Sequence, residues 1–285
     1  MSGAALYVYA IIPAKVGLPG SLTGIEGRPV RLIEAASGLA ALVHDAEPIP
    51  FQGPDEQVKG WIVEHSSVVE RAWEALGTVL PVTVNVIVKG GATASAEERL
   101  RAWLEQSEAS LRQRLDALRD RVELRVEITL DRVEAARSDP ESAALRAELA
   151  EKPAGLRRLL ERKLEQSEKG AVERLADRLY ADLRRRIATH AEDLVENRRT
   201  RPAPGLVPVL SMAVLVGRQG IEALGTELAE IQTELPAARI RFLGPWPPYS
   251  FAEVFDGLET GAEADNKKEG SEGRDTEGNG VDRRE

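Results

Sequence analysis

The sequence contains no cysteine, few aromatic side chains and no hydrophobic run long enough to cross a membrane. The absence of cysteine excludes disulfide bonds, thiolate metal sites and a cysteine nucleophile, and it fits a reducing compartment. A spanning helix needs roughly 18 apolar residues in a row, and no segment approaches this. The start, MSGAALYVYAIIPAK, has no basic segment before its apolar stretch, so it predicts a strand rather than a signal peptide. We therefore expect a soluble, cytoplasmic protein that does not enter a lipid membrane.

Recognisable catalytic motifs are also lacking. The three histidines, His44, His65 and His190, are far apart and lack the paired spacing of a metal site. His65 falls on the apolar face of a predicted helix, which favours a packed, hydrogen-bonded core histidine over a catalytic or pH-sensitive one. No GxSxG or other nucleophile motif is present. The formal charge of −9 disfavours nucleic acid as a partner, and we expect no metal, no cofactor and no enzymatic activity.

One segment has the composition of an anion-binding turn. The stretch VIVKGGATASAEER places Lys89 and a glycine pair between a predicted strand and a helix start. It matches neither a Walker A motif nor a GxGxxG fingerprint, and Ser95 with Glu98 three residues later predicts a capping box. We favour a turn followed by a capped helix. An enzyme that acts on an anionic substrate through Lys89 is the alternative.

Clusters of charge elsewhere predict solvated helix faces. Paired acids such as Glu97 and Glu98 stand among many other charges. The basic run LRRRIATH at 183–190 is interleaved with acidic residues, and Asp182 could pair with Arg186 at helical spacing. A phosphate-binding patch at this run is the alternative, which the near-cancellation of local charge disfavours.

The N-terminal part of the chain predicts an α+β unit. Apolar and β-branched runs predict strands, and apolar residues at helical spacing predict one helix that begins near the acidic Asp55 and Glu56 and ends at Gly77. The expected elements are strands at 6–13, 30–35, 38–46 and 79–91 and a helix at 53–77. This β-β-β-α-β order predicts a small antiparallel sheet domain at residues 1–92 with one helix on the sheet.

The remainder predicts a second α+β unit at residues 93–256. Strict alternation at 122–130 is typical of a strand with one solvated face. The long polar-and-apolar stretch from 140 to 197 predicts helices, broken near Pro153 and Gly155 because proline removes a helix bond. The other expected elements are a helix at 95–120, strands at 207–218 and 238–244, and a helix between those strands. Residues 257–285 are nearly free of apolar side chains and predict a disordered acidic tail.

The aromatic side chains gather at one place near the end. The chain has four Phe, four Trp and four Tyr, and five of these twelve lie between Phe242 and Phe255. The richest stretch is Gly244, Pro245, Trp246, Pro247, Pro248, Tyr249, Ser250 and Phe251. The prolines stiffen the segment and lower the entropy cost of fixing it. We therefore expect the segment to dock against its own domain, with the Trp246 ring in the core. A PxxP ligand for an aromatic groove on another protein is the alternative.

This octapeptide resembles the conserved C-terminal segment of the gas vesicle protein F/L family. Further similarity lies in LYVYAII at the N-terminus, in GIEGRPVRLIEAASGLAALVHDA, and around His65 and the VLP of residues 79–81. The similarity extends over roughly residues 5–255. The chain departs from the family in having VTVNV after Pro81, where Arg-Phe-Gly is common, and PAGLRRLL before the long helix, without the usual tyrosine.

The resemblance implies an α+β protein of two domains, the second a modified ferredoxin-like domain with an added helical section at about 140–199. It also implies a non-enzymatic accessory protein, associated with gas vesicles, that binds the hydrophobic shell protein and other accessory proteins during nucleation or growth. A protein-interaction scaffold that presents a proline-rich ligand and is unrelated to vesicles remains the alternative.

Overall fold

The computed structural model describes residues 5–14, 20–151, 153–197 and 202–252. Its contacts define two compact units, one formed by the chain up to Arg119 together with Ala252 and the other by Asp120–Phe251. The sequence predicts a domain boundary earlier, after residue 92. The division into independently folding domains stays a prediction. The predicted tail at 257–285 lies outside the described residues.

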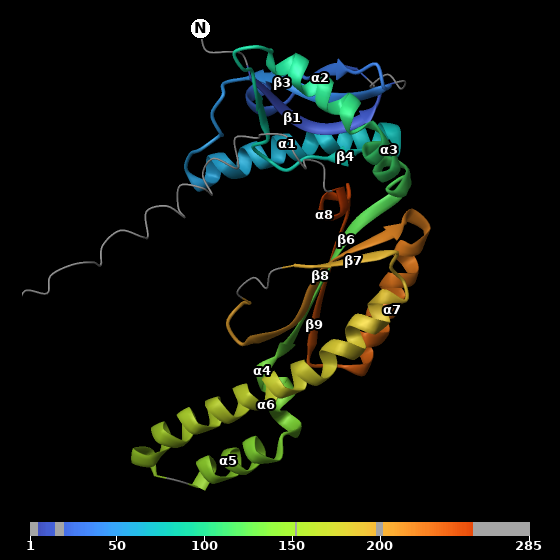
Figure 1. Cartoon of the computed structure of the whole chain (residues 1–285). Helices are drawn as coiled ribbons and strands as arrows, with labels where there is room; N and C mark the ends of the chain where they lie inside the picture. Colours follow the sequence, from blue (N-terminus) through green and yellow to red (C-terminus); the bar gives the residue numbers. More distant parts are fainter. Residues whose placement is uncertain (1–4, 15–19, 152, 198–201, 253–285) are drawn as a thin grey trace, which may run out of the picture. The chain divides into compact units, whose positions relative to one another are not determined.

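The first unit is an antiparallel sheet between helices. Its strand order is β2-β3-β1-β4, and β5 also pairs with β1. The strands are β1 (Ala5–Pro13), β2 (Arg31–Glu34), β3 (Leu39–Ala46), β4 (Leu80–Pro81) and β5 (Ile87–Lys89). The helices α1 (Asp55–Leu76) and α2 (Ala96–Gln106) lie on opposite faces (Figure 1), and a third, α3 (Glu108–Ala117), follows α2. Because both faces are covered, β1 is buried almost throughout.

Two expected elements of this unit are interrupted. The single strand predicted at 79–91 is wrong: a turn at Asn85, with φ of 70°, separates β4 from β5. Asparagine tolerates this left-handed conformation, and its side chain bonds both the N–H and the C=O of Phe51, at 2.9 and 3.1 Å. The helix predicted at 95–120 is divided at Ser107, whose φ of −96° and ψ of 7° lie outside the helical region.

Other local predictions are confirmed. Gly77 ends α1 with φ of 71°, which a side chain would strain. Ser95 and Glu98 form the predicted capping box at the start of α2, since the Ser95 hydroxyl accepts from the Glu98 N–H and the Glu98 carboxylate accepts from the Ser95 N–H.

The second unit is a four-stranded antiparallel sheet in the order β7-β8-β6-β9. Its strands are β6 (Arg121–Asp131), β7 (Asp193–Glu196), β8 (Leu206–Gly217) and β9 (Ala238–Trp246), and its main helices are α6 (Ala154–Ala188) and α7 (Ile221–Glu234). The succession β6-α6-β7-β8-α7-β9 with this strand order is that of a ferredoxin-like sheet. The added helices are α4 (Arg132–Ala135) and α5 (Pro140–Glu151), which precede α6 (Figure 1).

The long helical stretch is broken before α6 by Pro153, as predicted, whereas Gly155 lies within that helix. Its predicted extension to 197 is wrong, because Asp193–Glu196 pairs with β8 as a strand. The helices α6 and α7 contact each other and the sheet. Alternate residues of β6, from Val122 to Leu130, are fully buried, while those between them are half-buried. The expected alternation of β6 is confirmed.

Candidate functional site

The aromatic and proline segment begins where β9 departs from its partner strand. Leu243 lies opposite Arg125 and Trp246 lies opposite Glu123, so the chain bulges at the two residues between them, Gly244 and Pro245. Gly244 has φ of +115°, and a Cβ placed there would stand 2.8 Å from the Glu123 carbonyl oxygen. Only glycine suits this position. The peptide bond that follows it is cis.

A carboxylate from the middle of the sheet holds the end of this segment. The Glu123 Oε2 atom accepts from the Ser250 N–H at 2.7 Å, and its Oε1 atom accepts from the Ser250 hydroxyl at 2.8 Å. Glu123 thereby caps the four-residue helix α8 (Tyr249–Ala252) from another element. Burial raises the pKa of Glu123, and the two hydrogen bonds from Ser250 oppose that rise.

The segment is only partly docked. Pro247 and Pro248 are buried, and Tyr249 and Phe251 are half-buried. Trp246 is 36% exposed, so the expectation that this ring lies in its own core is wrong. The register explains the difference, since the ring belongs to the end of the edge strand β9. The assignment of Gly244–Phe251 as a functional motif stays a prediction.

The sequence does not indicate that Glu123 holds the segment Gly244–Phe251. The alternation of β6 places it among several charged residues on the more exposed face, where a solvated carboxylate is the usual outcome. Its partner is 127 positions away, and no local pattern indicates that pairing.

The histidine predicted to pack in the core does so. The Tyr7 hydroxyl accepts from the Asn85 N–H at 3.1 Å and lies 2.9 Å from His65 Nδ1. His65 Nε2 lies 2.9 Å from the Val82 carbonyl, which can only accept, so Nε2 carries the proton of the neutral ring and Nδ1 accepts from the Tyr7 hydroxyl. Burial lowers the pKa of His65 to about 4.

A second tyrosine–histidine pair lies on the same sheet face. The Tyr9 hydroxyl accepts from the Ile25 N–H at 2.9 Å and contacts His44 Nδ1 at 2.8 Å. The Tyr7 and His44 rings stack with centroids 5.0 Å apart. Burial lowers the pKa of His44 to about 4 and raises that of Tyr9 to about 12. Both pairs therefore hold a neutral histidine inside the first unit.

The turn around Lys89 has the capped-helix geometry that the sequence favours over an anion site. A cavity beside Gly90 and Gly91 is lined by charges of both signs. Its two arginines are ion-paired, Arg31 with Asp45 and Glu97 and Arg101 with Glu97. The Ser95 hydroxyl caps the Glu98 N–H, and the Glu98 carboxylate accepts from the Ser95 N–H. Carboxylates at a helix start repel a further anion. The geometry favours the turn and capping box.

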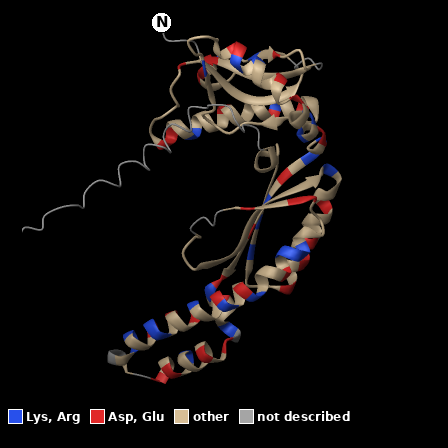
Figure 2. Ribbon diagram, in the orientation of Figure 1, with Lys and Arg blue, Asp and Glu red and all other residues tan. Residues whose placement is uncertain are grey.

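The basic run at 183–190 is ion-paired. Arg186 bonds Glu227 and also contacts Glu234, and His190 lies 3.3 Å from Glu227. Asp182 pairs with Arg185 rather than with the predicted Arg186. Cationic and anionic side chains are interspersed along α6 (Figure 2), so the run does not form a uniform phosphate-binding patch.

Within the described part of the chain, no group of three or more His, Cys, Asp or Glu residues could hold a metal ion. Over the same residues, no helix combines the length and apolar character that crossing a membrane requires.

The fold and the segment Gly244–Phe251 define an α+β protein with two antiparallel sheets and a proline-stiffened C-terminal motif. The sequence profile of the family described as gas vesicle synthesis protein GvpL/GvpF matches residues 5–253. The chain belongs to this family, and membership supports a role related to gas vesicles.

Relatives with similar sequences and structures agree with this assignment. Gas vesicle protein L1 of Halobacterium salinarum is 31% identical over 86% of this chain and 89% of its own length. Gas vesicle protein L of Streptomyces sp. is 28% identical over 87% of this chain and 92% of its own. The crystal structure of GvpF from Anabaena sp. has the same fold, with a TM-score of 0.64 at 19% identity over 89% of this chain and 98% of that one.

Proposed function

We propose that the chain is a non-enzymatic accessory protein of gas vesicle assembly that binds the hydrophobic shell protein and other accessory proteins during nucleation or growth. Subunits of a gas-filled wall expose apolar surface before they assemble, and such surface aggregates unless it is covered. A protein that covers it acts in the cytoplasm at the growing vesicle. It needs an apolar contact surface rather than a reactive group.

The exposed ring of Trp246 is the observation that supports this proposal most directly. Gly244 fits closely against β6, and Glu123 fixes Ser250 on the other side of the ring. A tryptophan fixed in this way offers a large contact area with little entropy left to lose on binding. Tryptophan is also enriched among the residues that dominate binding energy at interfaces.

The burial of Pro247 and Pro248 disfavours the alternative of an exposed PxxP ligand, because an aromatic groove on another protein reads a solvated polyproline helix. Because Pro247 and Pro248 are buried, the accessible part of the motif is Gly244–Trp246 rather than a continuous polyproline ligand.

Co-purification of the full chain with the shell protein tests the proposal. We expect Trp246→Ala to weaken the association about tenfold, as loss of an interface tryptophan does. Ile62→Ala, which removes a side chain 43% exposed in the first unit, serves as the matched control. No association of the wild-type chain, together with normal vesicles in a deletion strain, would refute the proposed function.

A further inference from the structure

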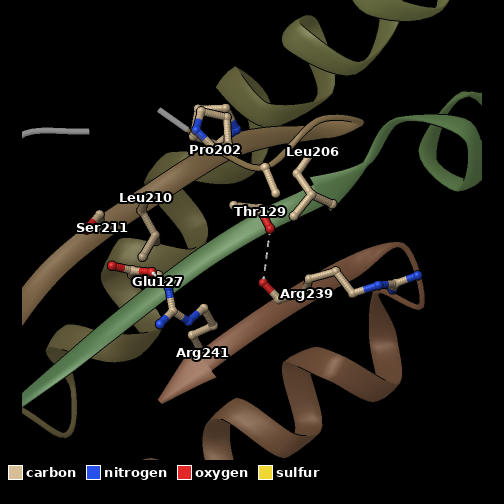
Figure 3. Close-up of a pocket in the computed structure, with 10 residues that line it drawn as sticks. Glu127, Thr129, Pro202, Leu206, Leu210, Ser211, Arg239 and Arg241 are labelled. Atoms are coloured by element: carbon tan, nitrogen blue, oxygen red, sulfur yellow. Dashed lines mark hydrogen bonds and ion pairs between the residues drawn. The ribbon is translucent and has the colours of Figure 1, made fainter. Parts of the chain in front are cut away.

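The more exposed face of the second sheet contains a cavity of about 200 Å³ (Figure 3). Its apolar wall includes Leu206, Pro208 and Leu210 of β8, and its polar rim includes Glu127 of β6 and Arg239 and Arg241 of β9. Sites for whole cofactors or drug-sized ligands are usually about 300–1,000 Å³. The size therefore fits one large apolar side chain better than a free cofactor.

The same sheet face already holds a peptide segment. Glu123 and Glu127 point to one side of β6, four residues apart, which is about 13 Å along a strand. Glu123 holds α8 through Ser250. The cavity beside Glu127 is thus the next position along a surface on which this fold docks a short piece of chain.

The rim of the cavity is positively charged. The Glu127 carboxylate is 15% exposed and lies 3.0 Å from Arg241 and 3.5 Å from Arg125, and Arg239 pairs with Asp131 at 3.7 Å. Of these charged groups, Arg239, Arg241 and Glu127 line the cavity itself, so its rim has one net positive charge in a chain whose formal charge is −9. The side chains of Arg239 and Arg241 are 49% and 67% exposed. Each guanidinium has five N–H donors in a fixed plane. Arg239 also donates from Nη1 to the Pro236 and Ala238 carbonyls, both at 2.9 Å. Arg241, which bonds Glu127 from one nitrogen, therefore keeps more of its donors for a ligand.

We propose that this cavity binds a segment of a partner protein in which a large apolar side chain is flanked by carboxylates. The apolar side chain enters the cavity against Leu206 and Pro208, and the carboxylates pair with Arg239 and Arg241. The inference rests on the proposed function for the origin of that segment, which belongs to the shell protein.

Binding of three short labelled peptides to the full chain tests the site directly. The first peptide has one Phe between two Glu pairs, the second has Lys in place of Glu, and the third has Ala in place of Phe. We expect the Glu–Phe peptide to bind about tenfold more tightly than either of the others by fluorescence anisotropy, because both the charge and the apolar side chain contribute.

Two sets of variants separate charge from cavity. R239E/R241E should reverse the preference, so that the Lys–Phe peptide binds best, whereas R162E/R178E makes the same charge change on exposed positions of α6 and should have no effect. Ser211→Phe fills the cavity and should remove the advantage of Phe over Ala. Equal binding of the Glu and Lys peptides, or equal effects of the two double variants, would overturn the inference.

Two further outcomes identify other occupants and would also overturn it. Peptide binding that appears only after residues 257–285 are removed would assign the cavity to the chain's own acidic tail. Self-association that R239E/R241E abolishes would assign it to a second copy.

Binding of the intact shell protein distinguishes the two proposals. If the shell protein binds and R239E/R241E has no effect, the proposed function stands and this site fails. If the Glu–Phe peptide binds but no vesicle protein does, the site stands and the proposed function fails.

Discussion

The two units treat buried polar groups in opposite ways. In the first, Tyr7 and Tyr9 each bond a buried histidine, and burial keeps both rings neutral. In the second, the half-buried carboxylate of Glu123 joins the sheet to a segment from the far end of the sequence. The first network fills a core, whereas the second fixes a motif that presents an exposed ring. Burial lowers the pKa of the two histidines but raises that of Glu123, so the two networks should change the free energy of unfolding in opposite directions as the pH falls.

Acid is expected to have the largest effect, and it acts on the first unit. The pKa of His44 and of His65 is about 4 in the folded chain, below the ordinary value of 6.5. The unfolded chain therefore takes up protons first, so stability that is present above pH 6.5 is lost as the pH falls towards 4. Between pH 6.5 and 5 the loss is about 2 kcal/mol for each histidine. Urea unfolding at pH 7 and 5 measures it.

The comparison sharpens with matched histidine variants. His65→Gln should remove about half of this pH dependence, even if the variant is less stable at every pH. His190→Gln alters the half-buried histidine on the second unit and should leave the dependence intact. If the free energy of unfolding of a His44→Gln, His65→Gln double variant still falls as strongly between pH 7 and 5, the assignment to these two rings is wrong.

Gly244→Ala should have the next largest effect, on the second unit. The new Cβ would stand 2.8 Å from the Glu123 carbonyl oxygen, in a backbone conformation that alanine rarely adopts. We expect a loss of about 3 kcal/mol in the free energy of unfolding. Gly205→Ala is the control, because φ there is +84° but the new Cβ meets nothing within 4 Å. Equal losses for the two variants would show that strain, not the contact with β6, limits the position.

Glu123→Ala should cost about 2 kcal/mol, because the Ser250 N–H loses a charged acceptor. Glu123→Gln keeps one acceptor and should cost less.

Since burial raises the pKa of Glu123, ionisation of this group makes the fold less stable as the pH rises above 4.5, opposite in sign to the histidines. The free energies of unfolding of wild type and Glu123→Gln at pH 4 and 7 check this. The stability advantage of wild type over the variant should be smaller at pH 7 than at pH 4.

Local patterns in the sequence predicted much of this fold, and long-range pairing accounts for what they missed. Alternation found β6, the Ser95 capping box found the start of α2, and Pro153 marked the start of α6. The apolar residues of Asp193–Glu196 continue the helical spacing, so the sequence predicts helix there, and only pairing with β8 makes the segment a strand.

The candidate site shows the same limit. Composition alone identified the motif, yet it could not show which ring stays exposed. That depends on the bulge at Gly244 and on Glu123, both of which are set by register with β6. The arginine rim of the cavity on this face likewise arises from strands that are distant in sequence.

Trp246→Ala should have the smallest effect on stability. A ring 36% exposed forfeits only part of the area that a buried one does, so we expect a loss of about 1–2 kcal/mol, compared with about 3–5 kcal/mol for a fully buried tryptophan. Trp73→Ala removes a ring that is 4% exposed in the first unit and provides the matched control. Urea unfolding of both variants measures the difference. If Trp246→Ala is as costly as Trp73→Ala, the ring is a core residue and its role in binding loses its support; a small loss of stability with a large loss of shell-protein binding would assign the ring to a partner.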